Sequence, residues 1–124
     1  MSGARTGNCE GCINPEQVAH IRQDMPREEA LYDIADFFKL LGDSTRLKIL
    51  YALQKTEVCV GDLSTALGLS QSSVSHQLRI LRQNDVVKFR RDGKVIYYCL
   101  DDDHVENLLT QGLEHMMHIK IYES

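Results

Sequence analysis

The 124-residue sequence has no long apolar run, and it contains no internal repeat or low-complexity segment. No stretch approaches the roughly eighteen apolar residues of a membrane-spanning helix, which argues against a helical membrane protein. The first residues, MSGARTGNCEGC, lack the apolar segment of a secretory signal. We therefore expect a cytoplasmic protein, in which the four cysteines are thiols before they are disulfides.

Acidic residues outnumber basic ones over the whole chain, 18 to 14, which gives a formal net charge of -4. This balance argues against nonspecific nucleic-acid binding by the entire surface. The charge is uneven, however, because basic residues outnumber acidic ones over residues 76–98 and acidic residues dominate from residue 100 onward. Local charge is what steers a polyanion, so the basic segment remains a candidate surface for nucleic acid.

Length and composition fit one soluble globular domain with a modest core, since 43% of the residues are hydrophobic. Residues 1–14 are small and polar, and they predict a flexible N-terminal arm that carries Cys9 and Cys12. Residues 15–124 are expected to form the domain itself. Pro15 fits the start of a short helix, and Pro26 breaks the next element.

Two further helices are predicted before the middle of the chain. The segment REEALYDIADFFKLLGD has helical periodicity and predicts a core-facing helix that stops at Gly42. Its apolar stripe consists of Leu31, Ile34, Ala35, Phe38 and Leu41. The segment DSTRLKILYALQK predicts a second helix, with Asp43 or Ser44 as its N-cap.

The segment VGDLSTALGLSQSSVSHQLRILRQNDVV has the pattern of a helix-turn-helix. It predicts a helix, a tight turn at Gly68, an N-cap at Ser70 and a second helix to about Gln83. The next segment, VVKFRRDGKVIYYCL, predicts a β-hairpin that turns at Asp92-Gly93, before a terminal helix. The expected fold class is therefore mainly α with a β-hairpin wing, a winged helix-turn-helix.

One face of the second helix of this motif has the chemistry of a DNA-reading surface. Val74, Leu78 and Leu81 form its inward stripe, whereas the opposite face carries forked or short hydrogen-bonding groups that reach base edges from the major groove. Basic residues near the hairpin turn are suited to neutralising phosphates. The predicted DNA-binding residues are Ser72, Ser75, His76, Arg79 and Gln83 of the helix and Arg90, Arg91 and Lys94 of the hairpin. A polar face that only meets water is the alternative, and the basic wing argues against it.

These segments, in this order, resemble the ArsR/SmtB family of winged-helix metal-sensing repressors over nearly the whole chain. The resemblance is carried by FFKLLGDSTRLKIL, EVCVGDLSTALGLSQSSVSHQLRILRQNDVV, FRRDGKVIYYCL and the aspartate and histidine pattern of the last helix. It is greatest to the branch that senses zinc, cadmium and lead. It implies a homodimer, formed through N- and C-terminal helices, that binds an imperfect inverted repeat in double-stranded operator DNA without metal. Metal binding would release the operator and derepress genes for metal efflux or sequestration.

The segment DDDHVENLLTQGLEHMMHIKI places three histidines on one stripe of the terminal helix. His104 and His115 are separated by about 16 Å along the axis, at about 1.5 Å per residue, which is too far for one metal ion. Two antiparallel copies across a twofold axis would bring His104 of one chain opposite His115 and His118 of the other. Asp102 adds a carboxylate oxygen, which completes a tetrahedral set suited to Zn(II). The family pattern, Asp-x-His with His-x-x-(Glu or His), matches these positions. Solvated histidines are the alternative.

Cysteines suggest a second, thiolate site for Zn(II), and for Cd(II) or Pb(II), which prefer soft ligands. The candidate ligands are Cys9, Cys12 and Cys59. The resemblance implies that the arm of one chain reaches Cys59 of the other. Gly61 stands where the cadmium sensors have a second cysteine of a Cys-x-Cys pair, so the fourth ligand is open between none, water, Asp62 and His20. Cys59 as a small core residue is the alternative, and Cys99 is interpreted as core packing.

Three other functions are alternatives to a metal-responsive repressor. A metal-dependent hydrolase is disfavoured because no general base or oxyanion donor accompanies the ligands, so we expect no enzyme activity. A thiol-based redox-sensing winged-helix regulator would respond to oxidant and not to removal of zinc. A winged helix that binds only proteins is disfavoured by the basic hairpin.

Overall fold

The computed structural model describes residues 11–120, and the chain divides into two compact units, residues 1–36 and 37–124. The first unit contains helix α1 (Pro15–Asp24) and the first part of α2 (Glu28–Leu41). Asn14 caps α1 by accepting hydrogen bonds from the N–H groups of Glu16 and Gln17, and Pro15 occupies the first turn. The predicted boundary between residues 14 and 15 therefore coincides with a helix start; most of the predicted arm, including Cys9, lies outside the described residues.

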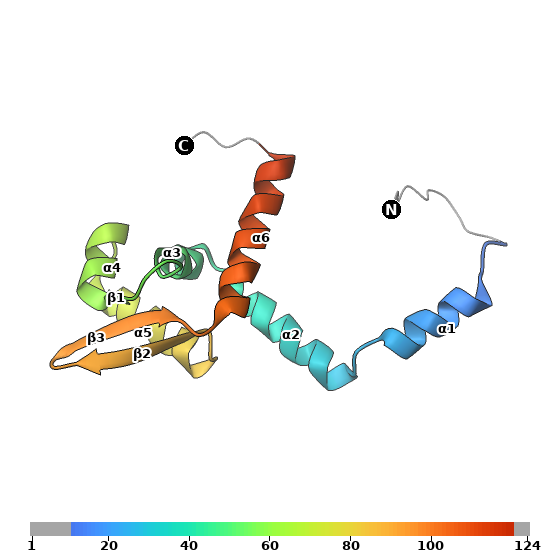
Figure 1. Cartoon of the computed structure of the whole chain (residues 1–124), viewed down its shortest axis with the longest axis horizontal. Helices are drawn as coiled ribbons and strands as arrows, with labels where there is room; N and C mark the ends of the chain where they lie inside the picture. Colours follow the sequence, from blue (N-terminus) through green and yellow to red (C-terminus); the bar gives the residue numbers. More distant parts are fainter. Residues whose placement is uncertain (1–10, 121–124) are drawn as a thin grey trace. The chain divides into compact units, whose positions relative to one another are not determined.

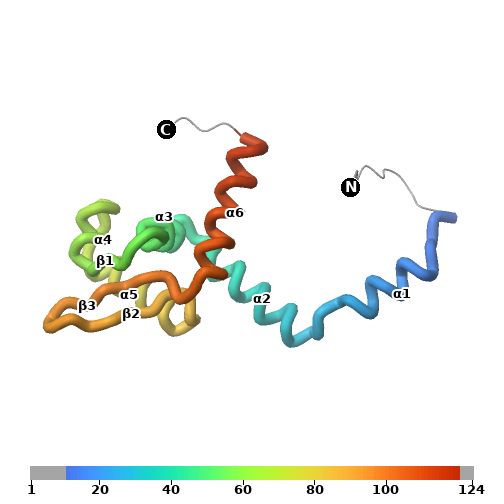
Figure 2. Tube along the Cα trace, viewed as in Figure 1, coloured from blue at the N-terminus to red at the C-terminus, as the bar shows by residue number. Residues whose placement is uncertain are grey.

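The second unit carries the remaining elements (Figure 1). In chain order they are α3 (Ser44–Ala52), β1 (Val58–Cys59), α4 (Val60–Leu67), α5 (Gln71–Gln83), β2 (Val87–Asp92), β3 (Val95–Leu100) and α6 (Asp103–Ile119). The Cα trace shows β2 and β3 as one projecting hairpin, with α6 leaving from the base of that hairpin (Figure 2). The wing tip and the terminal helix consequently lie at opposite ends of this unit.

The helix-turn-helix is confirmed at the level of single caps. Helix α4 ends at Gly68, whose φ of 68° is the left-handed conformation that glycine adopts without strain. Ser70 then caps α5 by accepting a hydrogen bond from the N–H of Ser73 at 3.0 Å. Asp43, the first of the two residues proposed for the cap of α3, accepts from Thr45 N–H at 2.8 Å. Short polar side chains thus fix where α3 and α5 begin, and a glycine fixes where α4 ends.

The wing is a three-stranded antiparallel sheet in the order β1-β3-β2. The hairpin of β2 and β3 was predicted, and Gly93 lies at its turn with a φ of 64°. Strand β1 was not predicted, because two residues are too few for an alternating pattern to show. It pairs through Val58 with Tyr98 and through Cys59 with Tyr97, which ties the start of α4 to the wing.

The core of the second unit lies between the helix-turn-helix, α3, the sheet and α6. Its buried residues are Leu41, Ile49, Leu50, Leu53, Leu63, Val74, Leu78, Leu81, Val86, Val87, Val105 and Leu109. The three residues predicted as the inward stripe of α5 are all fully buried. None of the described helices combines the length and the apolar character that a membrane crossing requires.

The prediction that α2 faces the core is wrong for most of that helix. Leu41 is buried at its end, but Ile34 and Phe38 are 49% and 51% exposed. The helix itself is present where the periodicity predicts it. Periodicity shows that a helix has an apolar face, but it does not show whether the surface that covers this face belongs to the same chain.

Candidate DNA-reading surface and metal ligands

The polar face of α5 is open to solvent. Ser72, His76, Arg79 and Gln83 are exposed, and Ser75 is half-buried. The opposite face is fixed in the core by three side chains with no solvent exposure: Val74, Leu78 and Leu81. Because burial of one face sets the rotation of the helix, the predicted reading residues all lie on the side available to a ligand.

Arg46 of α3 connects α5 to the end of α2. Its Nε donates a hydrogen bond to Oε1 of Gln77 at 2.8 Å, and its Nη1 donates to the carbonyl oxygen of Leu40 at 3.1 Å. Gln77 belongs to α5, and Leu40 is in the last turn of α2. The guanidinium group therefore satisfies an unpaired carbonyl at a helix end and also fixes the position of α5.

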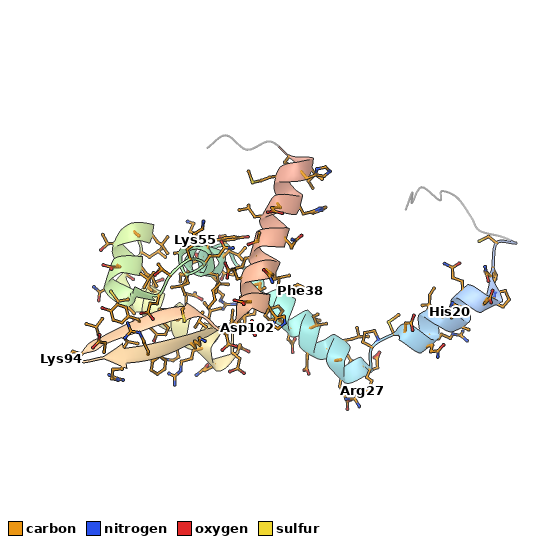
Figure 3. All side chains as sticks on the ribbon, in the orientation of Figure 1. His20, Arg27, Phe38, Lys55, Lys94 and Asp102 are labelled. Atoms are coloured by element: carbon orange, nitrogen blue, oxygen red, sulfur yellow. The ribbon has the colours of Figure 1, made fainter. Side chains whose placement is uncertain are left out.

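The three predicted basic residues of the wing have different surroundings. Lys94 lies at the far end of the hairpin (Figure 3), and Arg91 is exposed on β2. Within residues 11–120, neither has an ion-pair partner. Arg90 instead forms hydrogen bonds with the carboxylate of Glu57 and lies 3.8 Å from Oδ2 of Asp92. The hydrogen bond from Arg90 lowers the pKa of Glu57, so this carboxyl is ionised at neutral pH.

Two further basic side chains line a hollow between α5 and β2. They were not among the DNA-binding residues predicted from the sequence. Arg82 and Lys88 share this hollow with Arg79, and the guanidinium carbon of Arg82 lies 4.3 Å from the centre of the Phe89 ring. The excess of basic residues over residues 76–98 was the signal available for both. They lie between the reading helix and the base of the wing, in a hollow that Asp85 and Asp101 also line.

Asp102 and His104 form a pair at the start of α6. Figure 3 shows Asp102 at the junction between the sheet and this helix. Its Oδ1 accepts the N–H of Val105 at 3.1 Å, as an N-cap, and its Oδ2 lies 3.4 Å from Nδ1 of His104. The hydrogen bond from Val105 lowers the pKa of Asp102, and the neighbouring imidazole lowers it further. The side chain of His104 is 93% exposed, so both groups are open to a ligand.

His115 and His118 are exposed near the other end of α6. Among residues 11–120 of one chain, no three His, Cys, Asp or Glu side chains are placed to hold one metal ion. The structure therefore brings Asp102 and His104 together but leaves the histidine pair apart from them. The donor set, imidazole nitrogens with a carboxylate oxygen, fits Zn(II) in type, and its members lie as two separate pairs on α6.

The predicted thiolate ligands are described only in part. Cys9 lies outside the described residues; Cys12 is exposed in the first unit, and Cys59 is half-buried in the second. Cys59 is the N-cap residue of α4, but its side chain makes no capping hydrogen bond. Asp62 is exposed in the first turn of α4, and His20 is exposed on α1. Cys99 is half-buried on β3 and absent from the core, so its interpretation as core packing is wrong.

Comparison with known proteins matches the helix-turn-helix region. The profile of bacterial regulatory proteins of the arsR family matches residues 43–88. A transcriptional repressor SmtB homolog of Synechocystis is 41% identical over 104 residues, covering 84% of this chain and 79% of that protein. A cadmium resistance regulatory protein CadC homolog of Staphylococcus aureus is 35% identical, covering 86% of this chain and 88% of that protein. A homodimeric winged helix-turn-helix DNA-binding domain from Mycobacterium bovis has a TM-score of 0.68 at 27% identity, covering 82% of this chain and 95% of that domain.

Proposed function

Because this chain belongs to the arsR family of bacterial regulatory proteins, we propose that it represses transcription by binding operator DNA as a metal-free homodimer and that metal releases it. The chain is a transcription regulator and not an enzyme. The proposed inducer is Zn(II), with Cd(II) and Pb(II) as further candidates, and the regulated genes would encode metal efflux or sequestration. Its place of action is the cytoplasm, where operator DNA lies.

The observation that carries this proposal is the separation of two exposed donor pairs on one helix. Asp102 with His104 starts α6, whereas His115 with His118 lies near its end. A metal ion needs about four ligands within roughly 2 Å, so each pair is half of a site. Two chains related by a twofold axis would supply two complete sites, with Asp102 and His104 from one protomer and the histidine pair from its partner. The ion, when bound, would join the two terminal helices.

DNA binding is assigned to the open face of α5 and to the wing. The residues proposed for base contacts are Ser72, Ser75, His76, Arg79 and Gln83; Arg91 and Lys94 are proposed for phosphate contacts. In a dimer the two reading helices must match half-sites about one helical turn apart. Metal that fixes the terminal helices changes the relative orientation of the protomers. The spacing of the reading helices then no longer fits, and by linkage DNA must equally weaken metal binding.

A second site is proposed at Cys9, Cys12 and Cys59. The name of the CadC homolog associates that relative with cadmium resistance, and thiolates are the ligands that Cd(II) and Pb(II) prefer. Cys59 supports this role because the residue is only half-buried and its side chain makes no capping hydrogen bond. Zn(II) at the α6 site and a soft ion at the thiolate site are therefore separate ways to reach one response.

Fluorescence anisotropy of the reduced, metal-free protein on a duplex from its own promoter tests this function. We expect tight binding that Zn(II) releases in the wild type. The variants His104→Ala and His115→Ala should bind DNA as the wild type does but ignore Zn(II), and Asn107→Ala, at an exposed position on the same helix, is the matched control with an unchanged response. Release by Cd(II) alone would transfer regulation to the cysteines. Release by oxidant and not by metal would establish the redox alternative, and no binding would overturn the proposal.

A further inference from the structure

Arg90 differs from the other basic residues of the wing because its guanidinium group already has a carboxylate partner. Its Nε lies 2.9 Å from Oε1 and 3.0 Å from Oε2 of Glu57, and its Nη2 also donates to Oε1. The side chain of Arg90 is 53% exposed and that of Glu57 35% exposed. A guanidinium group bound to both oxygens of one carboxylate is fixed in direction as well as in position.

The register of the sheet shows what this contact joins. Arg90 on β2 pairs with Tyr97 on β3, and Tyr97 pairs on its other side with Cys59 on β1. Directly paired residues of antiparallel strands project from the same face. The guanidinium carbon of Arg90 lies 4.8 Å from the centre of the Tyr97 ring. Arg90 therefore crosses the middle strand, over an aromatic ring, to reach the residue immediately before β1.

We propose that Arg90 is a positioning residue of the wing, which braces β2 against β1 through Glu57 and Tyr97 and does not itself bind DNA phosphate. This inference rests on the proposed DNA-binding function. It divides the basic residues of the hairpin into two kinds: Arg90 sets the direction of the wing, and Arg91 with Lys94 contacts the backbone. It differs from the expectation raised by the sequence, in which all three bind phosphate.

Charge supports this division. For Arg90 to bind a phosphate, its guanidinium group would have to leave Glu57 or share that carboxylate. A bare carboxylate would then stand beside the DNA backbone, where like charges repel. Arg91 and Lys94 have no such competing partner within the described residues.

The substitution Glu57→Gln separates the two roles by the sign of its effect. If Glu57 only competes with DNA for Arg90, its neutralisation frees Arg90 and tightens operator binding. If the pair is a brace, the operator Kd rises about two- to five-fold, the range of a well-formed exposed ion pair. Asp85→Asn gives the background effect of removing one negative charge, because Asp85 is exposed, has a left-handed φ of 59° that asparagine tolerates, and forms no ion pair within residues 11–120.

The substitution Arg90→Lys keeps the charge but removes the planar guanidinium group. Only that group can bind both oxygens of a carboxylate and also stack on an aromatic ring. Arg22→Lys, the same exchange at an exposed position on α1, is its matched control. We expect Arg90→Lys to weaken operator binding about as much as Glu57→Gln, the double variant to lose no more than either alone, and Arg22→Lys to leave the affinity unchanged. Amide hydrogen exchange without DNA provides an independent measurement, since loss of a brace speeds exchange along β2 and β3 and loss of a phosphate contact does not.

The outcomes also separate this proposal from the proposed function. Tighter binding by Glu57→Gln than by Asp85→Asn, or unchanged exchange in both brace variants, overturns the role of Arg90 while leaving a DNA-binding repressor. Failure of the wild type to bind its promoter overturns the proposed function, and the exchange measurement on the free protein still decides whether the brace exists. Thermal unfolding of each variant shows that the fold is retained.

Discussion

The two carboxylate oxygens of Asp102 have different partners. One oxygen caps α6 through the N–H of Val105, and the other faces His104 as a proposed metal ligand. The same residue therefore starts the helix that carries the site and contributes to the site itself. Substitutions that preserve one role and not the other make these contributions separable.

We predict that Asp102→Asn leaves stability nearly unchanged, because asparagine is as good an N-cap as aspartate, whereas Asp102→Ala lowers the free energy of unfolding because the capping hydrogen bond is lost. Both should weaken Zn(II) binding because the carboxylate charge is lost. Urea unfolding of the metal-free proteins and competition for zinc with a chromogenic chelator measure the two effects. Equal zinc affinity in Asp102→Asn and the wild type would remove this residue from the site.

The pH dependence of the same pair has a definite sign. The pKa of Asp102 is lowered in the folded chain, so its stabilising effect is complete above its ordinary value and is lost as pH falls through the lowered value. The difference in unfolding free energy between wild type and Asp102→Ala should therefore narrow below about pH 4. A difference that stays constant down to pH 2 would mean that the ionised carboxylate contributes nothing to the cap.

At the scale of elements, the turn of the helix-turn-helix depends on one glycine. Gly68 has a φ of 68°, and a Cβ built there meets no atom within 4 Å. A side chain at position 68 would therefore have room, and only the left-handed backbone conformation disfavours a substitution there. This distinguishes a conformational cost from a packing clash, which would look the same in a simple activity assay.

We predict that Gly68→Ala lowers the free energy of unfolding by about 1–2 kcal/mol through the left-handed conformation. Gly68→Asn should cost less, because asparagine enters this conformation more readily. Urea unfolding ranks the two variants, and Gly112→Ala is the control, since Gly112 is helical, exposed and also has open space around its Cβ. If Gly68→Ala is as stable as the wild type, the turn has rearranged.

Helices and strands could be predicted from the sequence where residues close together in the chain determine them. Asn14, Asp43, Ser70 and Asp102 cap their helices through contacts to N–H groups two or three residues away. Such contacts are visible in the sequence because both partners are neighbours. Strand β1 is different: two residues become a strand because β3 lies beside them, and nothing in their own order records that.

At the scale of the whole molecule, large apolar side chains remain exposed on two helices. They are Tyr32, Ile34 and Phe38 on α2 and Leu113, Met117 and Ile119 on α6. Exposed large apolar side chains on a helix favour a surface that another protein covers. The twofold site proposed on α6 and the homodimeric relative from Mycobacterium bovis both favour a second copy of this chain as the partner.

We predict that Leu113→Glu converts the dimer to monomer, because a buried charge in an apolar interface lacks a partner. Leu113 is 45% exposed in the single chain, so the fold of each protomer should survive. Light scattering after size-exclusion chromatography gives the mass, and anisotropy should show weaker operator binding and no zinc response. Gln111→Glu, which adds the same charge on the same helix, should remain dimeric; a dimeric Leu113→Glu would exclude Leu113 from the interface.

The sequence by itself determined the order of the helices and of the two hairpin strands, the winged helix-turn-helix, the inward stripe of α5 and the residue types suited to metal and DNA. These features depend on periodicity, caps and turn residues, which act between near neighbours. Only the tertiary structure decided that Arg90 is held by Glu57, that Arg46 connects Gln77 to the end of α2, and that the apolar stripe of α2 remains exposed. The contacts of Arg90 and Arg46 join residues that are separated in the sequence, and the exposed face of α2 has no partner surface within the described residues. Neither kind of feature produces a pattern in the local sequence.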